Sequence, residues 1–183
     1  MIIRYLTRFL LCIAAFAASA PVSAATADAR DPYTYFFNLT TGDLKSDLAD
    51  AKSAGRKAVF VMFEQEGCPG CAFMKENVLN RADVQKFYRD NFVNLSLDIY
   101  GSVAVTDFTG RTSTEKGYAQ ASRVKGTPTL VFYDLSGNEV VRLLGAVKDA
   151  QEFMLLGEFV ASGAYKSRKF AEYKQDLLRK KGS

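Results

Sequence analysis

The sequence contains no histidine, and this absence removes whole classes of site. Without histidine the chain has no histidine general base and no histidine ligand for a metal. An excess of charge of one sign is also lacking, because 24 Lys and Arg residues face 20 Asp and Glu residues, a formal net charge of +4 at pH 7. So small an imbalance gives no electrostatic reason to expect nucleic acid as a partner.

The sequence also lacks a long hydrophobic run near its start. The apolar stretch over residues 9–18 is shorter than the about 20 residues that a membrane-spanning helix needs. Arg4 and Arg8 precede or adjoin this stretch, and small residues follow it, as in a secretory signal peptide. We therefore predict that residues 1–24 are a cleaved signal peptide and that the protein is periplasmic. An uncleaved anchor is the alternative.

Cysteine is scarce, and its placement is informative. Of the three cysteines, Cys12 falls inside the predicted signal peptide, which leaves Cys68 and Cys71, separated by Pro69 and Gly70. A disulfide between them closes too small a loop to stabilise a fold, so we interpret the pair as chemically active. A zinc site would need further ligands, which a chain with no histidine and one cysteine pair could supply only by bridging two copies. A structural disulfide is the other alternative.

The chain that follows the signal peptide is long enough for one domain. Residues 25–42 are interpreted as a leader segment, in which four aromatic residues either pack onto the domain or form a partner-binding patch: Tyr33, Tyr35, Phe36 and Phe37. Apolar periodicity predicts helices over 43–54, 68–79, 82–91, 114–122, 148–162 and 164–181, and strands over 57–63, 92–99, 130–133 and 139–144. Residues 100–113 are predicted to be an inserted loop. This order predicts an α/β fold with a mixed central sheet flanked by helices.

The two cysteines lie where a buried strand is predicted to end and a helix to begin. Pro69 suits the first turn of that helix. Unpaired backbone N–H groups and the positive end of the helix dipole then face the Cys68 sulfur and favour its thiolate, which is the attacking form. Cys71 lies one turn later and is expected to be more buried and to resolve a mixed disulfide. This chemistry calls for no metal and no cofactor other than the redox-active disulfide Cys68–Cys71.

The motifs together resemble a known superfamily. The strand–Cys68-Pro69-Gly70-Cys71–helix unit, the Gly126-Thr127-Pro128-Thr129 turn and the final hairpin resemble the thioredoxin superfamily. The runs over 63–69, 107–110, 127–129 and 163–166 are similar to those of SoxW-type thioredoxins, periplasmic proteins associated with sulfur-oxidation (Sox) gene clusters. The resemblance implies a thioredoxin-like domain over residues 43–163, followed by a C-terminal helical extension over residues 164–183.

The resemblance also implies a function. Pro128 would be a cis-proline facing the cysteines, and Thr127 would offer its backbone to an extended substrate strand. The protein would be a protein-disulfide reductase that acts on protein disulfides, with a Sox sulfur-carrier protein as client and a membrane thiol transporter as electron donor. Two alternatives stay open: a thiol reductase for cytochrome c maturation, and a thioredoxin-fold module that binds a partner without turnover.

The sequence departs from the thioredoxin pattern at two positions. Gly67 stands where thioredoxins usually carry a tryptophan, and tryptophan is absent from the whole chain. Met62 replaces the buried carboxylate that thioredoxins use as proton acceptor for the second cysteine. Glu64 or Glu66 could supply a supporting carboxylate, since both lie within a few residues of the pair. The alternative for each is a solvated surface carboxylate.

Overall fold

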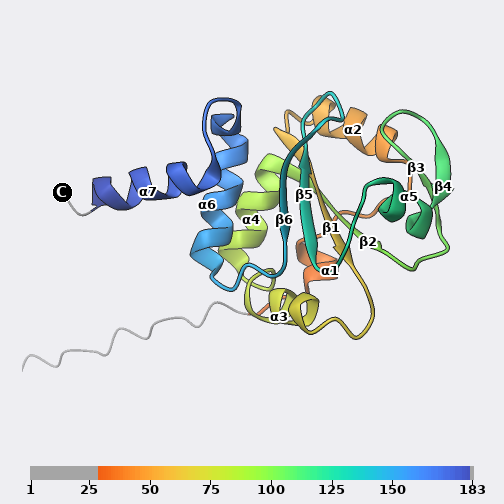
Figure 1. Ribbon diagram of the computed structural model, residues 1–183, viewed down its shortest axis with the longest axis horizontal. Coiled ribbons are helices and arrows are strands. Elements are labelled where there is room, and N and C mark those ends of the chain that lie inside the picture. Colours follow the sequence, from red (N-terminus) through yellow and green to blue (C-terminus); the bar gives the residue numbers. More distant parts are fainter. Residues whose placement is uncertain (1–28, 182–183) are drawn as a thin grey trace, which may run out of the picture.

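The computed structural model describes residues 29–181, so the predicted signal peptide lies outside the described residues. The helices and strands follow one another along the chain as shown in Figure 1. They are α1 (Pro32–Tyr35), α2 (Leu44–Ser53), β1 (Ala58–Glu64), α3 (Pro69–Asn77), α4 (Ala82–Asn91), β2 (Phe92–Asp98), β3 (Ala104–Thr106), β4 (Thr112–Thr114), α5 (Glu115–Ala121), β5 (Thr129–Tyr133), β6 (Glu139–Leu144), α6 (Ala150–Ala161), the 3-10 helix η1 (Ala164–Lys166) and α7 (Phe170–Lys181).

Four strands form the central sheet, in the order β2-β1-β5-β6. Strand β1 runs parallel to β2 and antiparallel to β5, and β5 pairs antiparallel with β6. Helices α4 and α6 cover one face of this sheet, α2 and α5 cover the other, and α1 and α3 lie together near one end of β1 (Figure 1). The mixed sheet flanked by helices confirms the predicted α/β class.

Strand β1 is the centre of the core, and all seven of its residues are buried. Because side chains alternate along a strand, Phe60 and Met62 join the core cluster that contains both cysteines, whereas Val61 and Phe63 join the cluster under α2 and α5. Burial on both faces explains the continuous apolar sequence from which the strand was predicted. Glu64, the last residue of β1, has the parity of Phe60 and Met62 and therefore points to the cysteine-bearing face.

The leader is packed onto the domain through its aromatic residues. Phe36 is fully buried and Phe37 nearly so, and both belong to the core cluster that contains the cysteines. Tyr33 and Tyr35, by contrast, are 52% and 46% exposed. The Asn38 N–H donates to the carbonyl of Asn94 on edge strand β2 at 2.7 Å, which ties the leader to the sheet.

The prediction of a loop over residues 100–113 is wrong in part, because β3 and β4 pair there as a two-stranded antiparallel sheet. The turn between them is held by Asp107, whose carboxylate accepts hydrogen bonds from the amides of Thr109 and Arg111 at 2.8 and 3.0 Å. Burial alone would raise the pKa of Asp107, but hydrogen bonds from the Thr109 hydroxyl, from these two amides and from the Arg111 guanidinium outweigh it and lower the pKa to about 2. Strands of three residues with mostly partly or fully exposed side chains leave no alternating pattern to detect.

The C-terminal extension is helical but is not one helix. Helix α6 ends before Gly163, which has φ +75°, and η1 and a short break precede α7. The rings of Phe170 and Tyr173 pack on Phe159 of α6 at centroid distances of 5.5 and 5.3 Å. Figure 1 shows α7 leading away from the body of the domain, so α6 is the main support of the extension.

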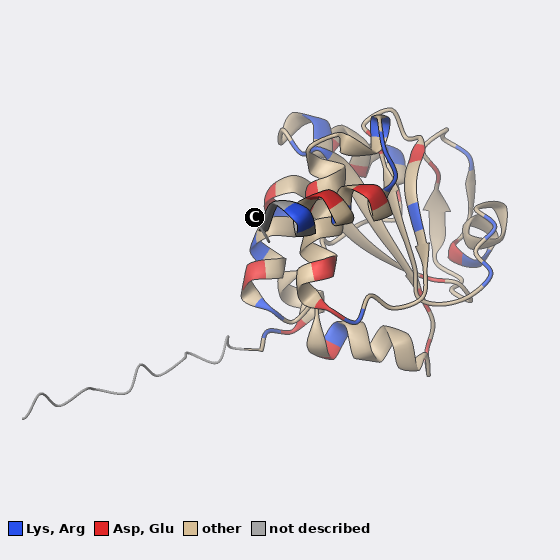
Figure 2. Cartoon of the chain, turned by 60° about the vertical axis from the view of Figure 1, so that its left-hand side comes forward, with Lys and Arg blue, Asp and Glu red and all other residues tan. Residues whose placement is uncertain are grey.

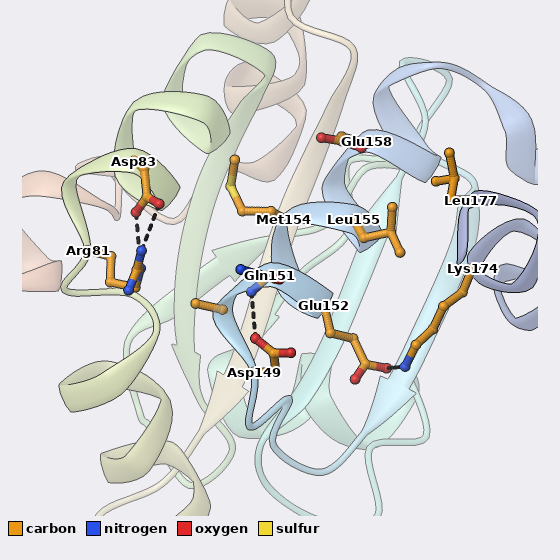
Figure 3. A pocket seen from close by; sticks show the side chains of 11 residues that line it. Arg81, Asp83, Asp149, Gln151, Glu152, Met154, Leu155, Glu158, Lys174 and Leu177 are labelled. Atoms are coloured by element: carbon orange, nitrogen blue, oxygen red, sulfur yellow. Dashed lines mark hydrogen bonds and ion pairs between the residues drawn. The ribbon is translucent and has the colours of Figure 1, made fainter. Parts of the chain in front are cut away.

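The charged residues of α6 are the two glutamates Glu152 and Glu158, whereas residues of both signs are interspersed along α7 (Figure 2). Lys174 pairs with Glu152 at 2.8 Å, and this pair lines a groove of about 510 Å³ between α4, α6 and α7 (Figure 3). The groove contains neither cysteine, so its size does not make it the site of the chemistry. In the part of the chain that the structure describes, every helix is too short or too polar to cross a bilayer.

Candidate active site

The cysteine pair sits at the junction of β1 and α3, as the sequence predicted. Gly67, with φ +70°, turns the chain after the end of the strand. Cys68 is the N-cap residue of α3, and Pro69 is its first helical residue. The sequence predicts a helix that begins at Cys68, whereas α3 begins one residue later, at Pro69. The difference matters, because an N-cap side chain faces the free amides of the first turn.

The two sulfurs are joined as a disulfide, with 5.3 Å between the Cα atoms. The Cys71 N–H donates to the Cys68 Sγ at 3.1 Å. Cys68 is 8% exposed and Cys71 is 1% exposed. When the disulfide is reduced, this amide and the positive end of the helix dipole favour a thiolate at Cys68, the more accessible of the two sulfurs.

Pro128 lies against the cysteine loop. The Thr127–Pro128 peptide bond is cis, and Pro128 is buried. A Cβ added at Gly70 would come within 2.9 Å of the Pro128 Cδ, which belongs to a rigid ring. Glycine at position 70 therefore lets the two loops approach each other closely, and any side chain there would force them apart. The structure thus brings Gly70, Pro128 and both cysteines together.

The loop carrying Pro128 is itself fixed at both ends. The Gly145 N–H donates to the Pro128 carbonyl at 2.8 Å, and the Thr129 hydroxyl donates to the Gly126 carbonyl at 2.6 Å. Thr129 also pairs with Phe63 in the β1–β5 ladder. These contacts hold the start of β5 at the same end of the sheet as the cysteine loop. Thr127, which precedes the cis bond, is half-buried there.

The two carboxylates considered as supporting groups have different environments. Glu66 is exposed, whereas Glu64 is 7% exposed and lies in a hydrogen-bond network. The Lys75 Nζ donates to Glu64 Oε2 and the Tyr33 hydroxyl donates to Glu64 Oε1, both at 2.8 Å. The Ser96 hydroxyl also donates to Oε1. The alternative of a solvated carboxylate therefore does not describe Glu64.

The network sets the charge state of its members. Burial alone would raise the pKa of Glu64, but the donors Lys75, Ser96 and Tyr33 outweigh it and lower the pKa below its usual value. Burial would likewise lower the pKa of Lys75, yet its bonds to Glu64 and Tyr33 raise it. Around neutral pH the Glu64 side chain is thus an anion and that of Lys75 a cation.

Sequence reasoning missed Tyr33, Lys75 and Ser96 as members of the site. Lys75 could have been found, because it lies four residues after Cys71 on the same helix face. Tyr33 and Ser96 carry no such signal, since they reach Glu64 from 31 and 32 residues away. Beside this network is a pocket of about 350 Å³ that is also lined by Gln65, Glu66 and Asp98.

A metal site is not evident in the residues that the structure describes, since they contain no cluster of three or more His, Cys, Asp or Glu side chains placed to hold an ion. The arrangement instead provides two bonded sulfurs, a helix N-terminus and a cis-proline loop in contact with the loop between the sulfurs. These parts are suited to thiol–disulfide exchange.

Comparisons with known proteins agree with the fold. Similar solved structures include a thioredoxin-fold protein from Helicobacter pylori, with 21% identity, a TM-score of 0.60, and coverage of 83% of this chain and 92% of that one. A thioredoxin from Thermus thermophilus has 32% identity and a TM-score of 0.50, with 63% and 81% of the two chains covered. The oxidised C-terminal domain of DsbD from Neisseria meningitidis has 21% identity and a TM-score of 0.50, with 68% and 98% covered. The search of curated proteins gave no match.

The family assignment rests on more than these structures. The family described as thioredoxin-like domain matches residues 44–161, which is more than half of the chain. The matched region includes the cysteine pair, the cis-proline loop and all four strands of the central sheet. The predicted thioredoxin fold is therefore confirmed, and the chain belongs to the thioredoxin-like domain family.

Proposed function

We propose that the protein is a thiol–disulfide oxidoreductase that acts on protein disulfides, with Cys68 as the attacking cysteine and Cys71 as the resolving one. The observation that carries this proposal is the Cys71 N–H at 3.1 Å from the Cys68 Sγ, at the N-terminus of α3. The Cys68 sulfur accepts this hydrogen bond, and Cys68 is also the less buried of the two cysteines. Pro128 and Thr127, beside the cysteine loop, are the proposed binding site for an extended client segment.

In the reductive direction the Cys68 thiolate attacks one sulfur of a client disulfide. A bond forms between Cys68 and that sulfur, the client S–S bond breaks, and the departing client thiolate takes up a proton. Cys71 then loses its proton and attacks the Cys68 sulfur, which closes the Cys68–Cys71 disulfide and releases the second client thiolate. Two electrons pass from the protein to the client in each cycle. No cofactor is required, because the sulfurs carry these electrons.

We assign the reductive direction from the residues between the cysteines. A disulfide is strongly oxidising when its reduced form is stabilised, chiefly through the thiolate of the first cysteine. Pro69 and Gly70 have no side-chain donor to stabilise that thiolate, and the chain has no histidine. We expect a reduction potential at or below about −200 mV, nearer to thioredoxin than to the strong periplasmic oxidase at about −120 mV. Equilibration with glutathione buffers measures it, and a potential above about −150 mV would make the protein an oxidant.

The proposed setting is the periplasm, reached through the predicted signal peptide. The SoxW-like runs in the sequence support a Sox sulfur-carrier protein as the client and a membrane thiol transporter as the donor that restores the dithiol. Of the two candidate carboxylates, Glu64 is the one that we place beside the site, because it is buried on the cysteine-bearing face of β1; its lowered pKa makes it a fixed charge there and not a proton acceptor. Gly70 supports the site by admitting the Pro128 ring.

Trapping of the mixed disulfide tests the assignment. Cys71→Ser removes the resolving sulfur, so client proteins should accumulate on Cys68, from which they can be released by reductant and identified. Cys68→Ser is the matched control and should accumulate none. In the reduced wild-type protein, iodoacetamide near neutral pH should label Cys68 first, since the thiolate fraction sets the rate. Preferential labelling of Cys71, or equal trapping by both variants, would contradict the assigned roles.

A further inference from the structure

Side chains from three elements form a set of mutual hydrogen bonds next to the cysteines. Tyr33 comes from α1, Glu64 from the end of β1 and Lys75 from α3. The Lys75 Nζ donates to the Tyr33 hydroxyl at 2.8 Å and to Glu64 Oε2 at 2.8 Å, while the Tyr33 hydroxyl donates to Glu64 Oε1 at 2.8 Å. Each of the three groups thus contacts both others, and the side chains of Glu64 and Lys75 are 10% and 25% exposed.

The set is close to the sulfurs along the chain and across the fold. Glu64 points to the same face of β1 as Met62, and Met62 belongs to the cluster that contains both cysteines. Lys75 lies one helical turn after Cys71, on the same face of α3, and helix side chains lean toward the helix N-terminus. Lys75 therefore lies one helical turn after the buried cysteine along α3, and Glu64 is bonded to it at 2.8 Å with a side chain that is 10% exposed.

The charge state of the set argues against a carboxylate that takes up a proton at neutral pH. Lys75 and the other donors hold the pKa of Glu64 below its usual value, so a proton taken from a thiol would not stay on this carboxylate. The cysteines instead lie near a fixed cation, the Lys75 ammonium, that is hydrogen-bonded to a fixed anion, the Glu64 carboxylate. Their fields nearly cancel as long as both charges are present and stay paired.

We propose that Tyr33, Glu64 and Lys75 form a charge-balanced unit that keeps either charge from shifting the thiolate stability of the cysteine pair, with Tyr33 as the positioning residue that ties the two charges together. This inference rests on the proposed redox function and deepens it. It also gives α1 of the leader a role in the chemistry, because the hydroxyl of Tyr33 is the contact that α1 makes with both charges. The other groups that face the unit are the Ser96 hydroxyl and, around the adjoining pocket, Gln65, Glu66 and Asp98.

The unit makes a prediction with opposite signs for its two charges. Glu64→Gln leaves the Lys75 cation unbalanced, which should favour thiolate, lower the pH midpoint of cysteine alkylation and raise the reduction potential. Lys75→Met leaves the Glu64 anion unbalanced and should shift both quantities the other way. For a charge about one helical turn away, we expect midpoint shifts on the order of one pH unit. The Lys75→Met shift should be the smaller, because an unpaired buried carboxylate takes up protons more readily.

A double variant keeps the test valid if a single variant is unstable. Glu64→Gln combined with Lys75→Met removes both charges, so its alkylation midpoint and potential should return close to those of the wild-type protein. Shifts of the same sign in the two single variants, or no shift in either, would overturn the charge-balance inference. Both readouts use the isolated protein without a client, so a failure of client trapping by Cys71→Ser would count against the proposed function alone.

Tyr33→Phe isolates the positioning role, because it removes the hydroxyl and keeps the ring. Glu64 then loses one donor, and its pKa should rise toward the ordinary value of 4.5. As the pH is lowered from about 7 to 4, protonation of Glu64 changes the reduction potential, and we call this part of the potential-against-pH curve the acid limb. In Tyr33→Phe the acid limb should move to higher pH by a few tenths of a unit or more. Tyr35→Phe is the matched control on the same helix and should leave the limb in place. An unmoved limb in Tyr33→Phe would show that Tyr33 only packs against the domain.

Discussion

Two segments lie outside the region matched by the thioredoxin-like family, and they are attached to the domain in different ways. The leader places Phe36 in the core and the Tyr33 hydroxyl on Glu64. The C-terminal extension is of similar length, but its half-buried rings Phe170 and Tyr173 rest mainly on one helix, α6. The contribution of an added segment therefore follows from what its side chains bury.

The largest effect is expected for Phe36→Ala in the leader. The Phe36 ring is fully buried and packs edge-on against Phe60 at 5.8 Å between centroids, with Tyr88 and Phe153 also in contact. Truncating it leaves a cavity, so the free energy of unfolding should fall by ~3–5 kcal/mol. Denaturant unfolding measures the loss, with Phe36→Leu as a milder second variant if the first does not fold.

Tyr35→Ala is the matched control for this first prediction. Tyr35 is 46% exposed and lies one position before Phe36 on the same segment. Its replacement should lower the free energy of unfolding by less than about 1 kcal/mol. Equal losses in Phe36→Ala and Tyr35→Ala would mean that the leader is held by its backbone contacts, and that the burial of Phe36 adds little.

A smaller effect is expected when the C-terminal extension is removed by truncation after Gly163. A large side chain contributes roughly 1.5–3 kcal/mol when fully buried, and Phe170 and Tyr173 are only half-buried, so the loss should be about 1–3 kcal/mol. The melting temperature should fall, while disulfide exchange stays largely intact because the extension packs on α6. An unchanged melting temperature would show that these rings are not packed in solution, and a loss of exchange would show that the extension reaches the site.

The parts of the structure that the sequence predicted are those with local signals. A continuous apolar run predicted β1, and the Cys68-Pro69-Gly70-Cys71 spacing at its end predicted a disulfide-forming pair at the start of a helix, because both patterns are contained within a few residues. Glycine and proline punctuation likewise located the hairpin of β5 and β6. Each of these features could be predicted because residue type alone determines the backbone locally.

The parts that were missed depend on tertiary contacts. Tyr33 and Glu64 are 31 residues apart and Tyr33 and Lys75 are 42 apart, so no periodicity links them. For the same reason the sequence does not show which carboxylate, Glu64 or Glu66, lies beside the cysteines. Their burial differs because α1 and α3 pack around the end of β1. The β3–β4 pair was missed because its strands are three residues long and have little apolar pattern.

The third prediction concerns the buried ion pair between Glu64 of β1 and Lys75 of α3. Glu64→Gln breaks the buried pair with Lys75 and should cost about 1–3 kcal/mol at neutral pH, since it removes hydrogen bonds to a charged group. Because the pKa of Glu64 is lowered by folding, its stabilisation is complete above the unfolded pKa and is lost as the pH falls through the folded pKa. The difference in unfolding free energy between wild type and variant should therefore shrink in acid. A difference that stays constant down to about pH 3 would contradict the lowered pKa.

The smallest effect is expected for Glu152→Gln, which breaks the pair between α6 and the extension. Glu152 and Lys174 are bonded at 2.8 Å, as close as Glu64 and Lys75, but their side chains are 37% and 38% exposed. Water and salt screen such a pair, so its loss should cost no more than about 0.5 kcal/mol, and less still in about 1 M salt. Unfolding curves of Glu152→Gln and Glu64→Gln at low and high salt compare the two ion pairs. Since both pairs have the same bond length, the comparison isolates the effect of burial. If Glu152→Gln costs as much as Glu64→Gln, burial does not explain the difference between the two ion pairs.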